Sequence, residues 1–212
     1  MSKPTADATD RPDVISRTGP RRSESARLAV LHAADDLLVE RGFAELTIEG
    51  IAQRAGVAKQ TIYRWWKSKV DILLDTLADD AREALQWRTP ESDTEAEEDL
   101  KAHLRRVAGF FQDPAGQVLQ ALVGHAQLDG KTARALRDGF LREQRERDIA
   151  GLRALLTRSP HVTVGDQAVG RLVDLLFGPL YYRALVLGEP IDEEVVEATA
   201  RAVLTLARES AA

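Results

Sequence analysis

Residues 47–69 decide the fold, and they read TIEGIAQRAGVAKQTIYRWWKSK. In the first part of this stretch, apolar residues recur at helical spacing, at Ile48, Ile51, Ala52 and Ala55. Thr47 stands where an N-cap hydroxyl would accept the free backbone N–H groups of the first turn. Gly56 suits the left-handed backbone that ends a helix and turns the chain sharply. The pattern therefore predicts a short helix, a tight turn and a second short helix.

We expect the second helix to run from Ala58 to about Lys67, with two faces of different character. The inward positions would be Ala58, Ile62 and Trp66. The outward positions would be Lys59, Gln60, Tyr63, Arg64 and Lys67. The outward face would therefore carry cations and no acid.

The window between Glu49 and Asp71 contains five basic residues and no acidic one, although the whole chain has a net charge of −5. The five are Arg54, Lys59, Arg64, Lys67 and Lys69. A basic surface on an acidic protein is typical of phosphate binding. Gln60 and Thr61 are neutral hydrogen-bonding groups, which suit the base edges of a major groove. We interpret the second helix as a DNA-reading helix; a solvated hairpin with surface lysines is the alternative.

From about Ser23 to Leu77 the sequence resembles the tetracycline-repressor (TetR) family of transcriptional regulators. The agreement rests on Thr47, Ile51-Ala52, Ala55-Gly56-Val57, Thr61-Ile62-Tyr63, Trp66 and Lys69. Three positions depart from the family pattern. Ala58 stands where a Ser or Thr usually caps the recognition helix, which removes a cap worth roughly 1 kcal/mol. Trp65 replaces the common His or Tyr, and Lys67 replaces a frequent Pro.

The resemblance implies a homodimeric repressor that binds a near-palindromic double-stranded operator and is released by a small-molecule effector. The two recognition helices would enter successive major grooves, about 34–36 Å apart. The implied DNA-contacting residues are Thr47, Ala58, Lys59, Gln60, Thr61, Tyr63, Arg64, Trp65 and Lys69.

The first 22 residues predict a flexible arm, because prolines and scattered polar residues cannot form an apolar face. A basic arm can reach into a minor groove, whereas a merely solubilising tail is the alternative. Its basic residues next to the first helix are Arg17, Arg21 and Arg22.

A first helix is expected from Glu24 to Arg41, capped by Ser23 and ended by Gly42. Its inward positions would be Leu28, Leu31, Ala34 and Leu38. We divide the chain into a flexible arm (1–22), a helix-turn-helix DNA-binding domain (23–68), and a helical effector-binding and dimerisation domain (69–212).

A connecting helix is expected over residues 69–87, begun by a capping box of Ser68 and Asp71. Lys69 at its N-terminus would contact a phosphate, helped by the positive end of the helix dipole. The resemblance implies that this helix links the effector domain to the DNA-reading head.

Composition is that of an ordinary globular protein, with 44% hydrophobic and 30% charged residues in 212. The chain has no cysteine, and its first twenty residues are too polar for a signal peptide, so we expect a cytoplasmic protein. The most apolar window, 169–188, is interrupted by Arg171, Asp174 and Arg183, which favours a buried helix over a membrane span.

The sequence after residue 87 predicts further helices. We therefore predict an all-α fold, with a three-helix N-terminal domain and a helical C-terminal domain. The expected helices are 95–112, 115–128, 131–158, 166–187 and 192–209. They are separated by Pro and Gly breaks, and no segment shows the alternation of a half-buried strand.

The last two predicted helices are amphipathic and would pair with a second copy as a four-helix bundle. The resemblance implies this dimer mode, and the GP-x-YYR pattern at Gly178 to Arg183 is similar to one C-terminal subgroup of the family. Pro179 should kink its helix. Packing within the monomer alone is the alternative. The candidate interface residues are Leu176, Gly178, Pro179, Tyr182, Val195, Thr199, Ala202, Val203 and Leu206.

The resemblance also implies a mostly apolar pocket for a small apolar or amphipathic effector. For each candidate residue, plain core packing is the alternative. The candidates are Phe110, Phe111, His125, Phe140, Phe177 and Tyr181.

Enzymatic interpretations find little support, since the sequence lacks HExxH, GxSxG and glycine-rich phosphate motifs. Asp99 and His103 could share a metal on one helix face, but no third ligand is in range, so we expect no metal and no cofactor. Two alternatives to a ligand-responsive repressor stay open: a DNA-binding activator or partner-recruiting regulator without an effector, and a helical enzyme or carrier with an incidental hairpin.

Overall fold

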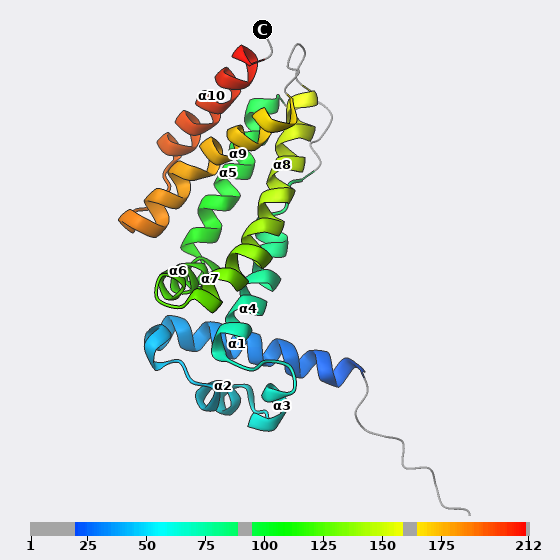
Figure 1. Cartoon of the computed structure of the whole chain (residues 1–212), viewed down its shortest axis with the longest axis vertical. Coiled ribbons are helices and arrows are strands. Elements are labelled where there is room, and N and C mark those ends of the chain that lie inside the picture. The colour runs from blue at the N-terminus through cyan, green and yellow to red at the C-terminus, as the bar shows by residue number, and fades with distance from the viewer. Residues whose placement is uncertain (1–19, 89–94, 159–164, 211–212) are drawn as a thin grey trace, which may run out of the picture.

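The computed structural model describes residues 20–88, 95–158 and 165–210, and Figure 1 shows their arrangement. Within these ranges every regular element is a helix, which confirms the all-α prediction. The predicted arm, residues 1–22, lies largely outside the described residues. The elements are α1 (Pro20–Glu45), α2 (Ile48–Ala55), α3 (Lys59–Tyr63), α4 (Lys69–Ala84), α5 (Ala96–Gln112), α6 (Pro114–Ala126), α7 (Gly130–Leu136), η1 (Arg137–Leu141), α8 (Arg142–Thr157), α9 (Asp166–Tyr181), η2 (Tyr182–Leu187) and α10 (Glu193–Glu209).

Helices α1, α2 and α3 form the head of the molecule, at the lower end in Figure 1. Thr47 Oγ1 accepts a hydrogen bond from Gly50 N at 3.1 Å, and Gly56 has a left-handed backbone with φ 66°. Ile51 and Ile62 are fully buried in the head. The predicted helix, turn and second helix are therefore confirmed in their order and in the caps of the first helix.

The second helix of the turn is shorter than expected, because α3 ends at Tyr63 and not near Lys67. Ala58 precedes α3 in an extended conformation, supplies no side-chain cap, and is exposed, so its predicted inward position was wrong. After Tyr63 the chain turns so that the Trp66 ring is buried and its Nε1 donates to Asp75 at 2.9 Å. A short uncapped helix has few hydrogen bonds of its own, so packing defines it.

Helix α1 is longer than predicted at both ends. It begins at Pro20, because the fixed backbone of proline suits a first helical position. Gly42 interrupts the helical path with a φ of 77°, but one more turn follows to Glu45. That turn places the carbonyls of Phe43 and Leu46 beside the start of α4.

The predicted capping box at the start of α4 is half confirmed. Ser68 Oγ accepts a hydrogen bond from Asp71 N at 3.2 Å, as expected. The Asp71 carboxylate accepts from Lys67 N at 3.0 Å, one residue before the position that a capping box requires. Both bonds fix the turn between α3 and α4.

Lys69 fastens the N-terminus of α4 to the end of α1. Its Nζ donates to Phe43 O at 2.6 Å and to Leu46 O at 3.0 Å, and it lies 4.2 Å from the centre of the Phe43 ring. Burial lowers the pKa of the Lys69 ammonium. The ammonium therefore satisfies two carbonyls that the end of α1 leaves without helical partners.

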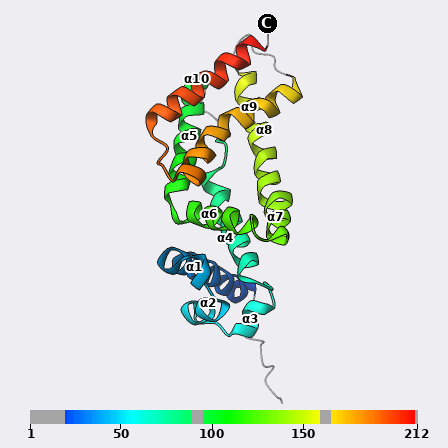
Figure 2. The same cartoon turned by 60° about the vertical axis from the view of Figure 1, so that its left-hand side comes forward.

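The body consists of α5, α8, α9 and α10, and α6 and α7 lie between it and the head (Figures 1 and 2). Helix α4 runs from the head into the body and packs on α1, α5 and α6. Helix α6 also packs on α1, so the head meets the body through two helices. One apolar core continues from Val30 and Ile62 in the head to Leu176 and Val203 in the body.

Two predicted helices are divided in the structure. Region 131–158 forms α7, the π-helical turn η1 and α8, because Gly139 leaves the helical path with φ −97° and ψ −105°. Region 166–187 forms α9 and the π-helical turn η2. Helix α9 continues through Pro179, and the departure from α-helical hydrogen bonding begins only at Tyr182.

The most apolar window of the sequence, 169–188, forms most of α9 and all of η2. Among the described residues, no helix is long and apolar enough to cross a membrane. Within the same ranges, no three acidic or histidine side chains are grouped closely enough to hold a metal ion.

Replacing Lys69 by alanine should lower the free energy of unfolding by about 1–3 kcal/mol, because two carbonyls lose a charged donor. Urea denaturation followed by circular dichroism measures this change. Lys67→Ala is the matched control: its side chain is exposed, and its effect should stay within about 0.5 kcal/mol. Equal stability of the Lys69→Ala variant and the wild type would show that the ammonium does not fasten α4.

Candidate functional site

The outward surface of α3 and of the turn after it is the candidate DNA interface. Gln60, Arg64 and Lys67 are exposed, and Tyr63 is 48% exposed despite its size. Thr61 is half-buried at the edge of the same surface. Together these side chains present hydrogen-bonding groups and positive charge on one face, as contacts to bases and phosphates require.

Three further predicted contact residues lie around this surface. Thr47 is exposed, and its hydroxyl already accepts the hydrogen bond that caps α2. Ala58 is exposed at the start of α3. Trp65 is half-buried, and its ring packs edge-on against Trp66 with 5.3 Å between centroids. Their roles in DNA binding stay predictions.

Two cations of the basic window are paired with acids of neighbouring helices. Arg54 forms ion pairs with Glu40 and Asp36 of α1, and the guanidinium lowers the pKa of Glu40. Lys59 forms an ion pair with Glu49 of α2. Arg54 therefore braces α2 against α1 and does not belong to a phosphate-binding surface. A phosphate would have to draw Lys59 away from Glu49.

Arg64 and Lys67 have no acidic partner among the described residues, so their charges are available to DNA. The predicted contact set omits Lys67, although the predicted helix already places it on the outward face. Lys69 belongs to that set, but its ammonium is bound by the carbonyls of Phe43 and Leu46. A phosphate at Lys69 would compete with both carbonyls.

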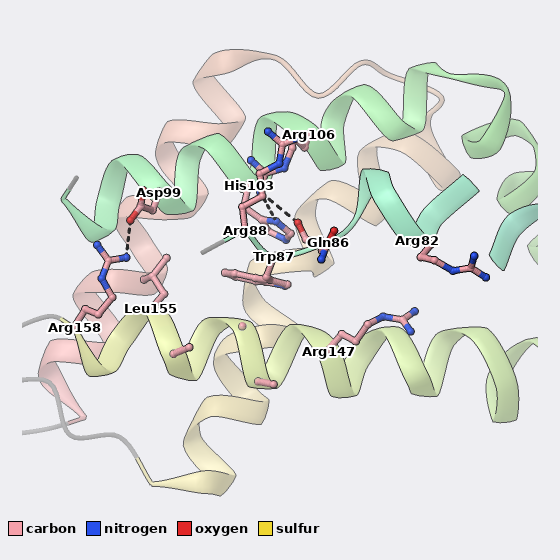
Figure 3. Close-up of a pocket in the computed structure, with 13 residues that line it drawn as sticks. Arg82, Gln86, Trp87, Arg88, Asp99, His103, Arg106, Arg147, Leu155 and Arg158 are labelled. Atoms are coloured by element: carbon pink, nitrogen blue, oxygen red, sulfur yellow. Dashed lines mark hydrogen bonds and ion pairs between the residues drawn. The ribbon is translucent and has the colours of Figure 1, made fainter. Parts of the chain in front are cut away.

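A cavity of about 780 Å³ lies in the body, between the C-terminal end of α4, α5 and α8 (Figure 3). From α5 it is lined by Asp99, His103 and Arg106. From α4 and the residues after it come Arg82, Gln86, Trp87 and Arg88. From α8 come Arg147, Ala150, Gly151, Ala154, Leu155 and Arg158.

Figure 3 shows Trp87 across the middle of this cavity, above α8. Arg82 and Arg147 lie at one end, and the ion pair of Asp99 with Arg158, 2.7 Å long, lies at the other. The cavity size is typical of sites for small molecules. Most of its lining surface is apolar, as the sequence predicts for an effector pocket, and charged side chains lie at its two ends.

Trp87 is held in place from three sides. Its ring stacks on His103 with 3.9 Å between centroids, and its Nε1 donates to Asp148 Oδ1 at 2.9 Å. Burial raises the pKa of Asp148 to about 6. Gly151 leaves room for the ring, because a Cβ there would lie 2.2 Å from the indole. The chain just after α4 is thereby joined to both α5 and α8.

The six residues predicted to line an effector pocket do not line this cavity. Phe110 and Phe140 are buried in the core, and Phe111 packs edge-on against Phe110 and Tyr181. Phe177 and Tyr181 line a smaller cavity of about 270 Å³. Core packing therefore describes Phe110 and Phe140, and a pocket role for Phe177 and Tyr181 stays a prediction.

The sixth candidate, His125, lies near the head and not in the large cavity. Its ring stands 4.6 Å from that of Phe43, and it lines a cavity of about 220 Å³ beside the start of α4. Three residues that line the large cavity could have been grouped from the sequence. Asp99, His103 and Arg106 are spaced four and three residues apart, which places them on one face of a helix.

An exposed apolar strip runs along α9, η2 and α10. Leu175, Tyr182, Val186 and Leu206 are between 39% and 69% exposed, which is unusual for large apolar side chains. We call the strip the C-terminal apolar face. Its residues are Leu175, Gly178, Pro179, Tyr182, Val186, Ala202 and Leu206.

Three predicted interface residues do not lie on this face. Leu176, Thr199 and Val203 are buried within the chain, because they pack toward the other helices of the body. Val195 is half-buried. On α9 the prediction was wrong by one residue: Leu175 is exposed where Leu176 was expected.

A helical head with an exposed cationic helix, joined to a helical body that holds a cavity, defines a helix-turn-helix DNA-binding regulator. The chain belongs to the TetR family of transcriptional regulators. Residues 30–76 match the bacterial regulatory proteins of the tetR family. Residues 91–203 match the tetracyclin repressor-like C-terminal domain. The predicted domain bounds stay a prediction.

Relatives agree with this assignment. The chain is 34% identical over 182 residues to the uncharacterized HTH-type transcriptional regulator YdeS of Bacillus subtilis (strain 168), covering 85% of this chain and 89% of that one. The crystal structure of the TetR family transcription regulator SCO0332 is 34% identical with a TM-score of 0.67, covering 85% and 97%. A putative TetR-family regulator from Mesorhizobium loti has the same fold, with a TM-score of 0.65 at 19% identity, covering 87% and 98%.

Proposed function

We propose that this DNA-binding regulator is a ligand-responsive repressor that acts in the cytoplasm as a homodimer on a near-palindromic operator. The observation that carries the proposal is the position of α4. One end of α4 is fastened to the head, and the residues after its other end, Gln86 and Trp87, line the large cavity. The helix has 16 residues, which span about 24 Å at about 1.5 Å per residue.

The head would read DNA with α3 in the major groove. Gln60 is exposed on α3, and Thr61 lies half-buried at the edge of the same surface. Both would contact base edges. Arg64 and Lys67 would contact phosphates and fix the register of the head on the duplex. Lys59 would join them if a phosphate replaced Glu49 as its partner.

The C-terminal apolar face supports the homodimer. Leu175 on α9, Tyr182 on η2 and Leu206 on α10 are exposed, and α9 packs against both η2 and α10. Two copies of this pair of helices would bury both strips around a twofold axis. The two heads would then be held at a fixed separation, as a palindromic operator requires.

Release from DNA would follow from differential binding. A ligand that fits the cavity better when α4 is tilted favours dimers whose heads no longer match the operator spacing. By linkage, operator DNA lowers the affinity for that ligand by the same factor. No enzymatic step is part of the proposal.

Replacing both Arg64 and Lys67 by alanine should weaken binding to every duplex and reduce its salt dependence. Each phosphate contact adds about 0.9 to the slope of log K against log salt, so a dimer should lose about 3–4. A fluorescence anisotropy titration at several salt concentrations, with a site selected from random DNA, measures both effects. An unchanged slope would rule out these two cations as phosphate contacts.

Two further variants complete that titration. Arg208→Ala removes an exposed charge in the last turn of α10, in the body and far from α3, and should leave the slope unchanged. Gln60→Ala should alter the preferred sequence and not the slope, because it removes a base contact. Absence of salt-sensitive binding to any duplex would overturn the proposed function as a whole.

Leu175→Glu should convert the dimer to a monomer at micromolar concentration, because each copy would bury an unpaired carboxylate in the shared interface. Sedimentation velocity measures the oligomeric state. Leu128→Glu is the control, since Leu128 is 89% exposed at the end of α6, away from the C-terminal apolar face. A Leu175→Glu variant that remains dimeric would place the interface elsewhere.

A further inference from the structure

The large cavity carries an excess of positive charge. Five arginines and a single carboxylate, that of Asp99, line it among the described residues. Asp99 accepts a hydrogen bond from Arg158 at 2.7 Å. The other arginines are Arg82, Arg88, Arg106 and Arg147. Arg82 and Arg147 are exposed and form ion pairs with Asp79 and Glu143, which do not line the cavity. Arg88 and Arg106 have no acidic partner among the described residues, so these two neighbouring charges favour a negative ligand.

Arg106 is a partly buried cation without an acidic partner in the described ranges. Its Nη1 donates to Ala102 O at 3.1 Å, and its Nη2 donates to Gln86 O at 3.5 Å. Its buried Nε has no partner there. Burial, and then the nearby charge of Arg88, lower the pKa of Arg106, although a guanidinium stays protonated. Withdrawal of a charge from water without a counter-ion is costly, and a bound anion would remove that penalty.

His103 supplies an unused hydrogen-bond donor beside Arg106. It is 1% exposed, and Arg106 Nη2 lies 3.3 Å from its Nδ1. A guanidinium can only donate, so Nδ1 is the acceptor. Burial and the charge of Arg106 lower the pKa of His103 to about 3, so the ring is neutral near pH 7 and its proton is on Nε2. That buried N–H has no partner among the described residues.

Much of the remaining cavity wall is apolar. The Trp87 ring lies over α8 in Figure 3, where the small residues Ala150, Gly151 and Ala154 face the cavity. Leu155 extends this surface toward the Asp99–Arg158 ion pair. An indole ring beside small residues suits a planar or unbranched apolar group.

We infer that the ligand of this cavity is an amphipathic organic anion, a carboxylate or a phosphate ester on an apolar body. The anionic group would be bound by Arg106 and Arg88, with the N–H of His103 as a neutral donor. The apolar body would lie along Trp87 and α8. This inference rests on the proposed ligand response and specifies its ligand class. It also narrows the small apolar or amphipathic effector that the sequence predicts to an anionic one.

Four compounds with the same ring system test the charge requirement by isothermal titration calorimetry without DNA. They are 2-naphthoate, 2-naphthyl phosphate, neutral 2-naphthamide and cationic 2-naphthylmethylammonium. At least one anion should bind about tenfold or more tightly than the amide, since a hydrogen bond to a charged group contributes about 1.5–3 kcal/mol. The order of the two anions decides between carboxylate and phosphate. Binding of the amide or the cation as tightly as both anions, or of neither anion, would overturn the inference.

Arg106→Gln should weaken binding of the preferred anion about tenfold and leave the affinity for 2-naphthamide unchanged. Arg134→Gln is the matched control: it removes an exposed arginine of α7 outside the cavity and should change neither affinity. If Arg106→Gln fails to fold, Arg88→Gln serves instead, with an expected loss of about threefold for an exposed charge. Unchanged anion affinity in the folded variant would contradict the inference.

Adding the same compounds to the protein–operator complex, with DNA release followed by fluorescence anisotropy, separates this inference from the proposed function. Selective anion binding without release of operator DNA would support the ligand class and contradict the ligand-responsive repressor. DNA release by the neutral amide alone would support the ligand-responsive repressor and contradict the anionic ligand class.

Discussion

The attachment of α4 to the head is the interaction on which the rest of the structure depends. The Lys69 ammonium binds the carbonyls of Phe43 and Leu46, and the Trp66 indole donates to Asp75 one turn and a half farther along α4. Without these contacts the turn that follows the short α3 would not be fixed against α1 and α4. With them, the exposed cations after α3 are held at a fixed angle to a helix that reaches the cavity. The DNA surface and the cavity thus share one rigid element.

The opposite end of that element explains why a ligand would influence DNA binding. Trp87 is stacked on His103 and hydrogen-bonded to Asp148, so the residues after α4 are packed between α5 and α8. A ligand that separates Arg106 from α8, or draws them together, must displace Trp87. Because the indole lies directly against Gly151, it has no room to move toward α8, and a ligand-driven motion of the ring would pass into α4. Packed interiors shift between discrete arrangements and do not deform continuously.

Local sequence chemistry predicted the head well, because caps and turns depend on nearby residues. The hydroxyl of Thr47 predicts the N-cap of α2, and the missing Cβ of Gly56 predicts the left-handed residue that ends it. Both predictions are confirmed. The length of α3 could not be predicted, because it is set by Trp66 folding toward Asp75, a contact with another helix. The same holds for Leu175 and Leu176, since helical spacing alone does not say which of two neighbouring leucines faces the core. In the body, the cavity arginines could not be predicted, because a helical arginine usually lies on the solvent side and only the packing of α4, α5 and α8 brings these together.

Hydrogen exchange followed by mass spectrometry on the wild-type protein tests most directly whether α4 is one element held at both ends. If it is, amides from Ile72 to Ala81 exchange slowly and together with the core amides of α1, at the rate of global unfolding. Fast exchange in the first turns of α4, while α5 and α8 stay protected, would mean that the head moves independently of the body, and that the cavity cannot control it through this helix.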